Sequence, residues 1–217
     1  MSEVKSKSAA FFEAIENRRS YYNLTKESPL SNDQLKEIVQ KAVKFAPTSF
    51  NGQQSRAVLV TGKKHEELWD TVLEAYKPTL GGNKEQEAFW TDKIATQYKA
   101  GYGSVIFFED QDVINAFAGK MPFLSQHFPI WSENSAGILQ YIVWTALEAE
   151  GYGASLQHFG GFVPQVQTDV NKLLDLSPQW KNTAILPFGV PSGPPGQPGK
   201  GEKTFEPLEN RTKFFFD

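Results

Sequence analysis

The sequence predicts an α+β domain built on one central sheet. Short apolar strand candidates occur singly between amphipathic helices along the chain. One of them, residues 104–108, is a nearly continuous apolar run, which is typical of a strand buried on both faces. With 217 residues and no internal repeats, the chain fits a single domain. We assign that domain to residues 1–217, with a flexible N-terminus at 1–8 and an extended C-terminal arm at 191–217.

The clearest helix begins at Ser31-Asn32-Asp33-Gln34, which matches the capping-box pattern of a serine followed by glutamine three residues later. Apolar residues then recur at helical spacing, and Pro47 ends the pattern. The residues that share this apolar face are Leu35, Ile38, Val39, Ala42 and Val43.

The other elements follow from the same patterns of periodicity and turn residues. In chain order we expect a helix at 9–17, a strand at 57–61, a helix at 63–76, a loop at 78–82, a charged helix at 85–99, a strand at 104–108, a helix at 110–118, a helix at 132–150, a strand at 154–158, a helix at 166–176 and a strand at 183–190. The helix at 132–150 is apolar around most of its circumference, which predicts a central, buried position. Gly151 is expected to end it in the left-handed conformation.

Composition excludes several classes of function. A formal net charge of −3 gives no global basic field for nucleic acid. The absence of cysteine excludes disulfides, cysteine-ligated metals and a thiol nucleophile, and the three histidines lack metal-ligand spacing. Without a secretory signal or a membrane-spanning apolar run, we expect a protein that is cytoplasmic, or also nuclear in a eukaryote, and that does not bind membranes.

The C-terminal arm begins with a proline- and glycine-rich tract at 191–199, which cannot continue as helix or sheet. It delivers a tail at 203–217 that contains Phe205, Phe214, Phe215 and Phe216. Because four aromatic side chains are costly to leave in water, we expect the tail to dock on the chain's own body or on a second subunit.

Three short segments are candidates for a binding site. Arg18-Arg19-Ser20 follows the first helix, and two guanidinium groups with a hydroxyl suit a phosphate. The alternative is a solvated basic pair at a helix C-terminus. The loop Pro47-Thr48-Ser49-Phe50-Asn51-Gly52-Gln53 could offer polar groups to a flat ring, or could simply end a helix.

The third segment is Gly151-Tyr152-Gly153-Ala154-Ser155-Leu156-Gln157-His158. Its small residues would permit close approach to a planar ligand, and His158 could donate a proton or contact a ring edge. The alternative is a tight turn followed by a histidine that only satisfies its own hydrogen bonds. No side chain is assigned a catalytic role, and no metal site is expected.

Together these segments resemble the FMN-dependent nitroreductase family over Phe11 to Phe215. Arg18-Arg19-Ser20 matches the family's R-R-S-like triplet, and Pro47 to Gln53 matches its P-S-S-x-N-x-Q-like loop. Further matches to the compact branch that includes the yeast fatty-acid-repression-mutant protein are Ala100-Gly101-Tyr102-Gly103-Ser104, Trp131-Ser132-Glu133-Asn134-Ser135, Trp144-Thr145-Ala146-Leu147-Glu148, Gly153 to His158, and Pro207-Leu208-Glu209 with Arg211.

The resemblance implies a nitroreductase-like fold with a mostly antiparallel sheet and a C-terminal extension exchanged across a homodimer. It implies FMN bound at the subunit interface, with the partner subunit contributing the loop after the second helix. The residues it assigns to the cofactor are Arg18, Arg19, Ser20, Tyr22, Pro47, Thr48, Ser49, Asn51, Gln53, Ser155, Leu156, Gln157, His158, Lys203 and Arg211.

The implied activity is transfer of reducing equivalents from NADH or NADPH to a small flat acceptor, a nitroaromatic or quinone, by a ping-pong mechanism. Departures from the family pattern at Tyr22, Gln54-Ser55 and His158 leave the donor and acceptor preference open. Two alternatives stay open as well. One is another flavin chemistry on this fold, such as dehalogenation or flavin destruction. The other is a redox-sensing or regulatory flavoprotein in lipid signalling or the oxidative stress response.

Overall fold

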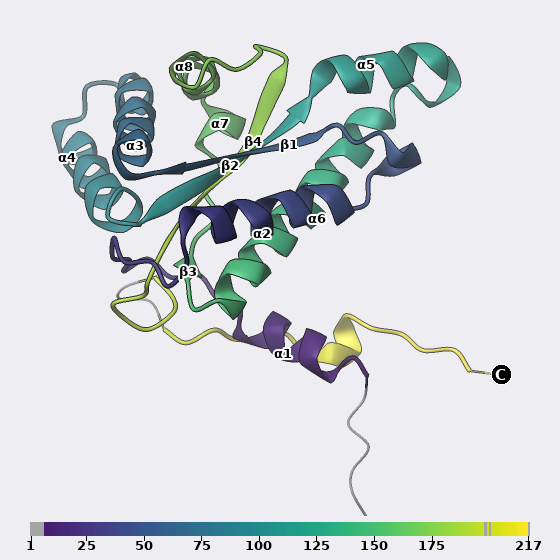
Figure 1. Cartoon of the computed structure of the whole chain (residues 1–217), viewed down its shortest axis with the longest axis horizontal. Helices are drawn as coiled ribbons and strands as arrows, with labels where there is room; N and C mark the ends of the chain where they lie inside the picture. The colour runs from purple at the N-terminus through teal and green to yellow at the C-terminus, as the bar shows by residue number, and fades with distance from the viewer. Residues whose placement is uncertain (1–6, 198, 200, 217) are drawn as a thin grey trace, which may run out of the picture.

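A computed structural model describes residues 7–197, 199 and 201–216 of the chain. It shows one central sheet with helices on both faces, as the sequence predicts (Figure 1). The flexible N-terminus expected at 1–8 falls mostly on residues 1–6, which lie outside the described residues.

The sheet has four strands in the order β1-β2-β4-β3, and every neighbouring pair is antiparallel. This confirms the antiparallel sheet implied by the family resemblance. The strands are β1 (Ser55–Thr61), β2 (Gly103–Asp110), β3 (Gly153–Ala154) and β4 (Trp180–Gly189). β2 lies in the centre and is buried from Gly103 to Glu109, so its continuous apolar run is explained.

The helices are α1 (Ala9–Asn17), α2 (Asn32–Phe45), α3 (Gly62–Tyr76), α4 (Lys84–Lys93), α5 (Gln111–Lys120), α6 (Phe128–Ala149), α7 (Phe159–Phe162) and α8 (Pro164–Leu173). Short 3-10 turns occur at Ser49–Asn51, Lys77–Leu80, Pro122–Leu124 and Leu208–Asn210. The capping box at the start of α2 is present, with Ser31 accepting from the Gln34 amide and the Gln34 side chain accepting from the Ser31 amide. Gly151 takes the expected left-handed conformation.

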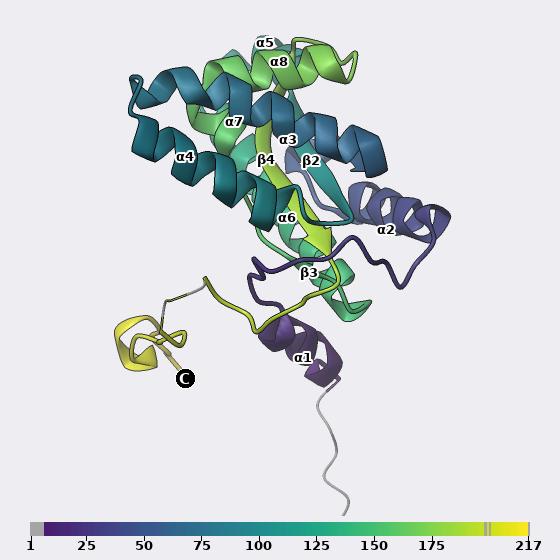
Figure 2. The same cartoon turned by 90° about the vertical axis from the view of Figure 1, so that its left-hand side faces the viewer.

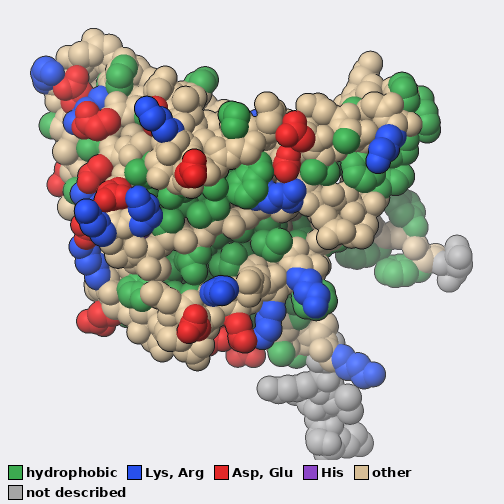
Figure 3. Space-filling model, turned by 45° about the horizontal axis from the view of Figure 1, so that its top comes forward, with side chains coloured by type: hydrophobic (Ala, Val, Ile, Leu, Met, Phe, Trp, Pro, Cys, Tyr) green, Lys and Arg blue, Asp and Glu red, His purple; other side chains and the backbone are tan. Residues whose placement is uncertain are grey.

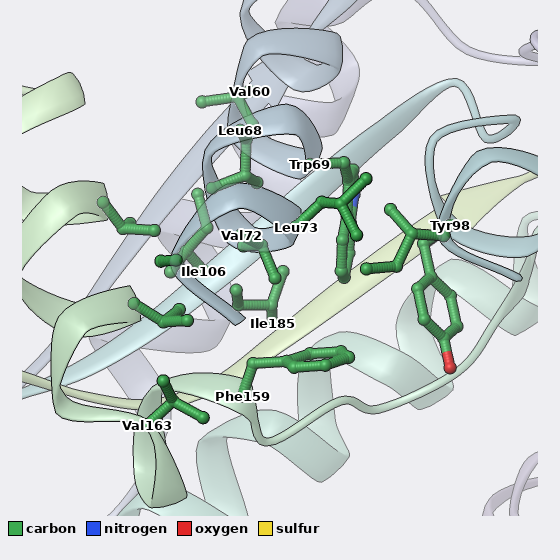
Figure 4. Packing of buried hydrophobic residues seen from close by; sticks show 14 of the residues in the cluster. Val60, Leu68, Trp69, Val72, Leu73, Tyr98, Ile106, Phe159, Val163 and Ile185 are labelled. Atoms are coloured by element: carbon green, nitrogen blue, oxygen red, sulfur yellow. The ribbon is translucent and has the colours of Figure 1, made fainter. Parts of the chain in front are cut away.

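Each face of the sheet buries its own core. α3, α7 and α8 cover one face, where Ile106 of β2 packs with Ile185 of β4 (Figures 1 and 4). In Figure 4, Phe159 of α7 lies among the side chains of α3 and β4. α2 and α6 cover the other face, where Val105 and Phe107 of β2 point. The alternation of β2 side chains between two apolar layers fixes the register of the sheet.

The charged helix predicted at 85–99 is present as one continuous helical stretch, but its last turn is not α-helical. α4 ends at Lys93, and a π-turn follows at Ile94–Tyr98, closed by a hydrogen bond from the Lys99 amide to the Ile94 carbonyl. Ile94 and Tyr98 are both buried in the core beside α3. Ile94 and Tyr98 are four residues apart, which is an ordinary helical spacing, so the apolar pattern does not distinguish this π-turn from a further turn of α-helix.

The prediction of a strand over 154–158 is wrong for most of that range. β3 contains only Gly153–Ala154, and the chain pairs with β4 again only at Gln157, opposite Ile185. Between these points the chain faces Pro187, which has no amide proton to complete the ladder. A proline on the neighbouring strand therefore interrupts this one.

The sequence predicts a central, buried position for the helix at 132–150, and α6 is buried only on the side that faces the sheet. Leu139, Val143 and Leu147 are buried against the sheet, whereas Ile130 and Ile138 are exposed. The sheet covers one side of the helix, so the second apolar face points outward. Although α6 has 22 residues, no helix in the described ranges is both long and apolar enough to cross a membrane.

The proline- and glycine-rich tract runs beside residues 20–25 as irregular chain. Ser192 and Gly196 donate backbone hydrogen bonds to Asn23 and Ser20. Beyond it, the described tail from residue 201 to residue 216 is exposed throughout and projects away from the helices (Figure 2). The aromatic side chains of the tail do not pack on the chain's own body, and their docking on a second subunit stays a prediction.

Candidate functional site

The predicted phosphate-binding residues line one pocket. Its volume is about 530 Å³, and Arg18, Arg19, Ser20, Tyr22 and Lys203 all face it. Tyr141 and Trp144 of α6 and residues 196–197 complete the lining. Arginines at the start of the chain and a lysine from its C-terminal arm are therefore brought together, as the resemblance implies.

Backbone hydrogen bonds hold this wall in place. α1 ends where the Arg18 amide donates to the Ala14 carbonyl. The Tyr21 amide then donates to the Ala154 carbonyl of β3 over 2.9 Å. Gly153 permits this approach, because a Cβ at that position would lie 2.7 Å from the Tyr21 Cβ. The arginines are thus attached to the edge of the sheet.

Arg18 is oriented by the aromatic side chains of α6. Its guanidinium carbon lies 4.4 Å from the ring centroid of Trp144 and 5.9 Å from that of Tyr141. Its Nε is buried and has no hydrogen-bond partner in the structure. Trp144 is half-buried and lines the pocket. No local sequence pattern distinguishes a stacking tryptophan on α6 from a core one.

The pocket is positively charged without compensation by ion pairs. None of the ion pairs within the described residues uses Arg18, Arg19 or Lys203. Burial raises the pKa of the nearby Glu148, although the Arg19 amide and the Arg18 charge partly oppose this. Three cations that converge without a paired carboxylate repel one another, and a bound anion relieves that repulsion. The donor set fits a phosphate monoester.

Arg211 is not part of this pocket. It follows the 3-10 turn Leu208–Asn210 in the exposed tail. Its assignment as a phosphate ligand stays a prediction.

The second predicted segment lines a different groove. Thr48, Asn51 and Gln53 border a cavity of about 410 Å³ between α2 and β1, together with Arg56 and Trp180. Pro47 follows the end of α2, and Ser49 faces a smaller cavity beside Trp131 and Ser132. Figure 3 shows a face of the molecule on which apolar side chains line a central hollow bordered by charged ones.

The backbone of this loop is strained. Phe50, Asn51 and Gln53 have φ angles of 54°, 52° and 51°, in the left-handed region that non-glycine residues rarely adopt. Each costs about 1 kcal/mol or more, and such residues cluster at binding sites. Hydrogen bonds within the loop support this conformation, including one from the Gln53 amide to the Thr48 hydroxyl over 3.0 Å.

The third segment lies outside both cavities. Ser155 is buried and accepts a hydrogen bond from the Gln157 side chain, and Leu156 packs partly against the core. His158 is exposed, with its Nδ1 3.2 Å from the Thr183 carbonyl. Thr183 is the extra residue of β4 where its register with β2 shifts. Bulges of this kind often redirect a side chain.

One chain does not bring the first two segments together. Arg18 packs on Trp144, whereas Phe50 packs on Phe128 and Trp131. Trp144 lies thirteen positions after Trp131 on α6, which is about 20 Å along the axis. The two segments therefore lie at opposite ends of α6 (Figure 1). A site that uses both within a small ligand's reach needs a second copy of the chain.

A buried carboxyl group that was not predicted from the sequence lies beneath the loop. Glu109 ends the buried run of β2 and is 2% exposed, and the Ser132 hydroxyl donates to its Oε2. Burial raises the pKa of Glu109, and hydrogen bonds from neighbouring polar side chains offset part of that effect. A glutamate directly after an apolar strand was the available signal.

Comparison with known proteins gives a consistent result. The model of the nitroreductase family matches residues 15–190. The chain is 36% identical over 197 residues to the nitroreductase FRM2 of Saccharomyces cerevisiae, covering 90% of this chain and 92% of that protein. It is 31% identical over 209 residues to HBN1 of the same yeast, covering 95% and 97% respectively. FRM2 is the fatty-acid-repression-mutant protein, so the resemblance noted in the sequence is confirmed.

Solved structures agree with this result. The nitroreductase CinD of Lactococcus lactis superposes with a TM-score of 0.82 at 33% identity, covering 94% of this chain and 98% of that one. That structure is a complex with nicotinic acid, and others of the same enzyme hold chloramphenicol or 4-nitrophenol.

Proposed function

The chain belongs to the nitroreductase family, and on that premise we propose that it is an FMN-dependent oxidoreductase. It would pass reducing equivalents from NADH or NADPH to nitroaromatic or quinone acceptors. The observation that carries the proposal is the pocket where Arg18, Arg19 and Lys203 converge without a carboxylate partner. That pocket suits the phosphate of FMN, and the buried, unpartnered Nε of Arg18 is a donor for it.

Each residue of the pocket has a role that follows from its chemistry. Arg18 and Arg19 would donate to phosphate oxygens, and Lys203 would add a third positive charge. The Ser20 hydroxyl and Tyr22 would complete the polar wall. Trp144 keeps the Arg18 guanidinium in place by stacking, so less side-chain entropy is lost on binding.

We propose that the working site is shared by two chains of a homodimer. Thr48, Ser49 and Asn51 of the partner subunit would reach the same cofactor, because their own copies lie at the far end of α6. Pro47 and Gln53 shape that loop. The exposed outer face of α6 and the exposed aromatic tail are apolar surfaces for the partner to cover. The C-terminal arm would then be exchanged between subunits.

When bound, FMN supplies the redox chemistry, accepting hydride from a reduced nicotinamide and passing electrons to an acceptor. Residues Ser155 to His158 would border its ring. Donor and acceptor would occupy the same place in turn, which gives ping-pong kinetics. The aromatic ligands of the Lactococcus enzyme support a flat acceptor. We expect the chain to position the reactants without an essential side-chain acid.

The decisive experiment is the absorbance spectrum of the purified protein with FMN, before and after each nicotinamide is added. We expect a flavin spectrum that bleaches with NADH or NADPH and returns with a nitroaromatic or quinone. A protein that does not bind FMN contradicts the proposal. A flavin that binds and is reduced by neither nicotinamide favours the redox-sensing or regulatory alternative.

Arg18→Ala tests the phosphate assignment. Loss of one of three cations should weaken FMN retention about tenfold or more while the dimer stays folded. Lys41→Ala, an exposed position on α2, removes the same charge and should retain FMN. If Arg18→Ala keeps its flavin at full occupancy through dilution, the assignment is wrong.

A further inference from the structure

The side chain of Arg56 joins the strained loop to the rigid end of the sheet. Its Nη1 donates to the carbonyls of Gln53 and Ser55, and its Nη2 donates to the Asp110 carboxylate over 2.9 Å. The pair is largely shielded from water, with side-chain exposures of 28% for Arg56 and 14% for Asp110. The guanidinium also lies over the Trp180 ring. It is therefore held from three sides.

Asp110 is itself held in place by hydrogen bonds of its side chain and its backbone. Its carboxylate caps α5 by accepting from the Asp112 amide over 3.1 Å. Its own amide donates to the Gln54 carbonyl over 2.9 Å. Because Asp110 ends the central strand β2, Arg56 fastens the end of the loop to the most buried strand of the protein.

The loop needs such a support. The amides of Asn51, Gly52 and Gln53 are bonded only to Thr48 and Ser49, within the loop itself. Gln53 adopts a left-handed conformation, and its carbonyl is one of the two backbone carbonyls that Arg56 holds. A strained conformation persists when the surrounding structure determines it more than once. Arg56 is the contact from outside the loop that reaches Gln53.

We propose that Arg56, acting through Asp110, is a positioning residue that presets the loop Thr48–Gln53 for the ligand. This inference rests on the proposed function, in which the loop serves the FMN of the partner subunit. A loop that is already ordered loses less entropy on binding, so holding the loop in place increases the affinity for the ligand. Arginine suits the task because its planar fork can serve two acceptors at once.

The test compares Arg56→Met with Lys181→Met in the full-length protein. Lys181 forms an exposed ion pair with Glu133 near the same end of the sheet, so it controls for loss of a cation. Two quantities are measured: hydrogen exchange at the amides of Asn51, Gly52 and Gln53 without FMN, and the FMN dissociation constant from quenching of flavin fluorescence. The first does not depend on the enzyme's activity.

In Arg56→Met we expect exchange at the three loop amides to quicken about tenfold, with β1 and β2 amides unchanged. The FMN dissociation constant should rise about tenfold. Lys181→Met should match the wild type in both measurements. Loop exchange and FMN affinity equal to wild type in Arg56→Met would overturn the inference, and so would faster exchange spread evenly over the sheet, which indicates a general structural role.

Asp110→Asn keeps a capping oxygen for α5 and removes the negative charge that holds Arg56. If Arg56→Met does not fold, this variant tests in its place whether the ion pair orders the loop. Faster exchange confined to the loop supports the inference, and wild-type exchange overturns it. If the wild type itself does not bind FMN, the proposed function fails, and the exchange measurements still decide whether Arg56 holds the loop.

Discussion

Single residues decide how this protein responds to pH, and His65 is the clearest case. It is 1% exposed on α3, its Nδ1 lies 3.0 Å from the Ser104 hydroxyl, and Trp69 donates to the same hydroxyl. Because Trp69 can only donate, we infer that the Ser104 hydroxyl donates to Nδ1 of a neutral imidazole. Burial lowers the pKa of His65 from 6.5 to about 4.

The depressed pKa gives a stability that depends on pH in one direction. Well above pH 6.5 His65 is neutral in both folded and unfolded chains, and its contribution to stability is complete. As the pH falls towards 4 the unfolded chain takes up a proton first, so the folded state loses stability. We expect a loss of roughly 3 kcal/mol in the free energy of unfolding across this range.

Urea unfolding at several pH values between 7 and 4 measures this effect. His65→Asn should lack this part of the pH dependence, although it should be less stable at pH 7. His127→Asn, the same substitution at an exposed position, should follow the wild-type curve. A wild-type curve parallel to that of His65→Asn would show that His65 titrates normally in the folded chain.

At the scale of elements, the distance between two packed elements decides which residue type fits at their contact. α7 lies against β4 at Gly160, where a Cβ would be 2.0 Å from the Asn182 Oδ1. Asn182 cannot move freely, because its side chain donates to the carbonyls of Phe107 and Ala184. The close packing of α7 against β4 therefore requires a glycine at position 160.

We predict that Gly160→Ala lowers the free energy of unfolding by about 2 kcal/mol, since overpacking a tight site forces side chains from their rotamers. Gly161→Ala is the matched control, because a Cβ there meets nothing within 4 Å. Thermal or urea unfolding compares the two. Equal stabilities for the two variants would show that α7 can move away from β4 without cost.

The boundaries of the helices and strands show where sequence periodicity is enough to predict an element and where it is not. The helix from Asn32 to Phe45 was predictable because its cap, apolar face and stop are all local. The strand expected at 154–158 failed because Pro187, more than thirty residues away, faces it. The outward face of α6 could not be foreseen, because apolar spacing does not say which neighbour covers each side.

At the scale of the whole molecule, the chain exposes apolar side chains that a partner could cover. Phe214, Phe215 and Phe216 of the tail are 72–93% exposed, and no described residue of α1 is buried. Such surface is expected at an interface between copies of the chain. The shared site proposed above would depend on it.

We therefore expect the substitution of Phe214, Phe215 and Phe216 by serine to shift a dimer towards monomer and to weaken FMN retention. The fold of each chain should persist, because these side chains touch little of their own body. Analytical ultracentrifugation and circular dichroism measure the two effects. Phe89→Ser with Phe162→Ser, at exposed positions outside the tail, should leave the assembly unchanged. A serine-substituted tail that dimerises as the wild type does would remove the tail from the interface.

The sequence by itself determined the class of fold, most helices and strands, the family, and the identity of the phosphate-binding candidates. These depend on local periodicity, caps and short motifs, and Arg18-Arg19-Ser20 is such a motif. Only the tertiary structure decided that Trp144 stacks on Arg18 and that the loop at Thr48 lies at the other end of α6. The physical reason is that these contacts join residues far apart in the chain. Their geometry is set by how helices pack on the sheet, and no local pattern records it.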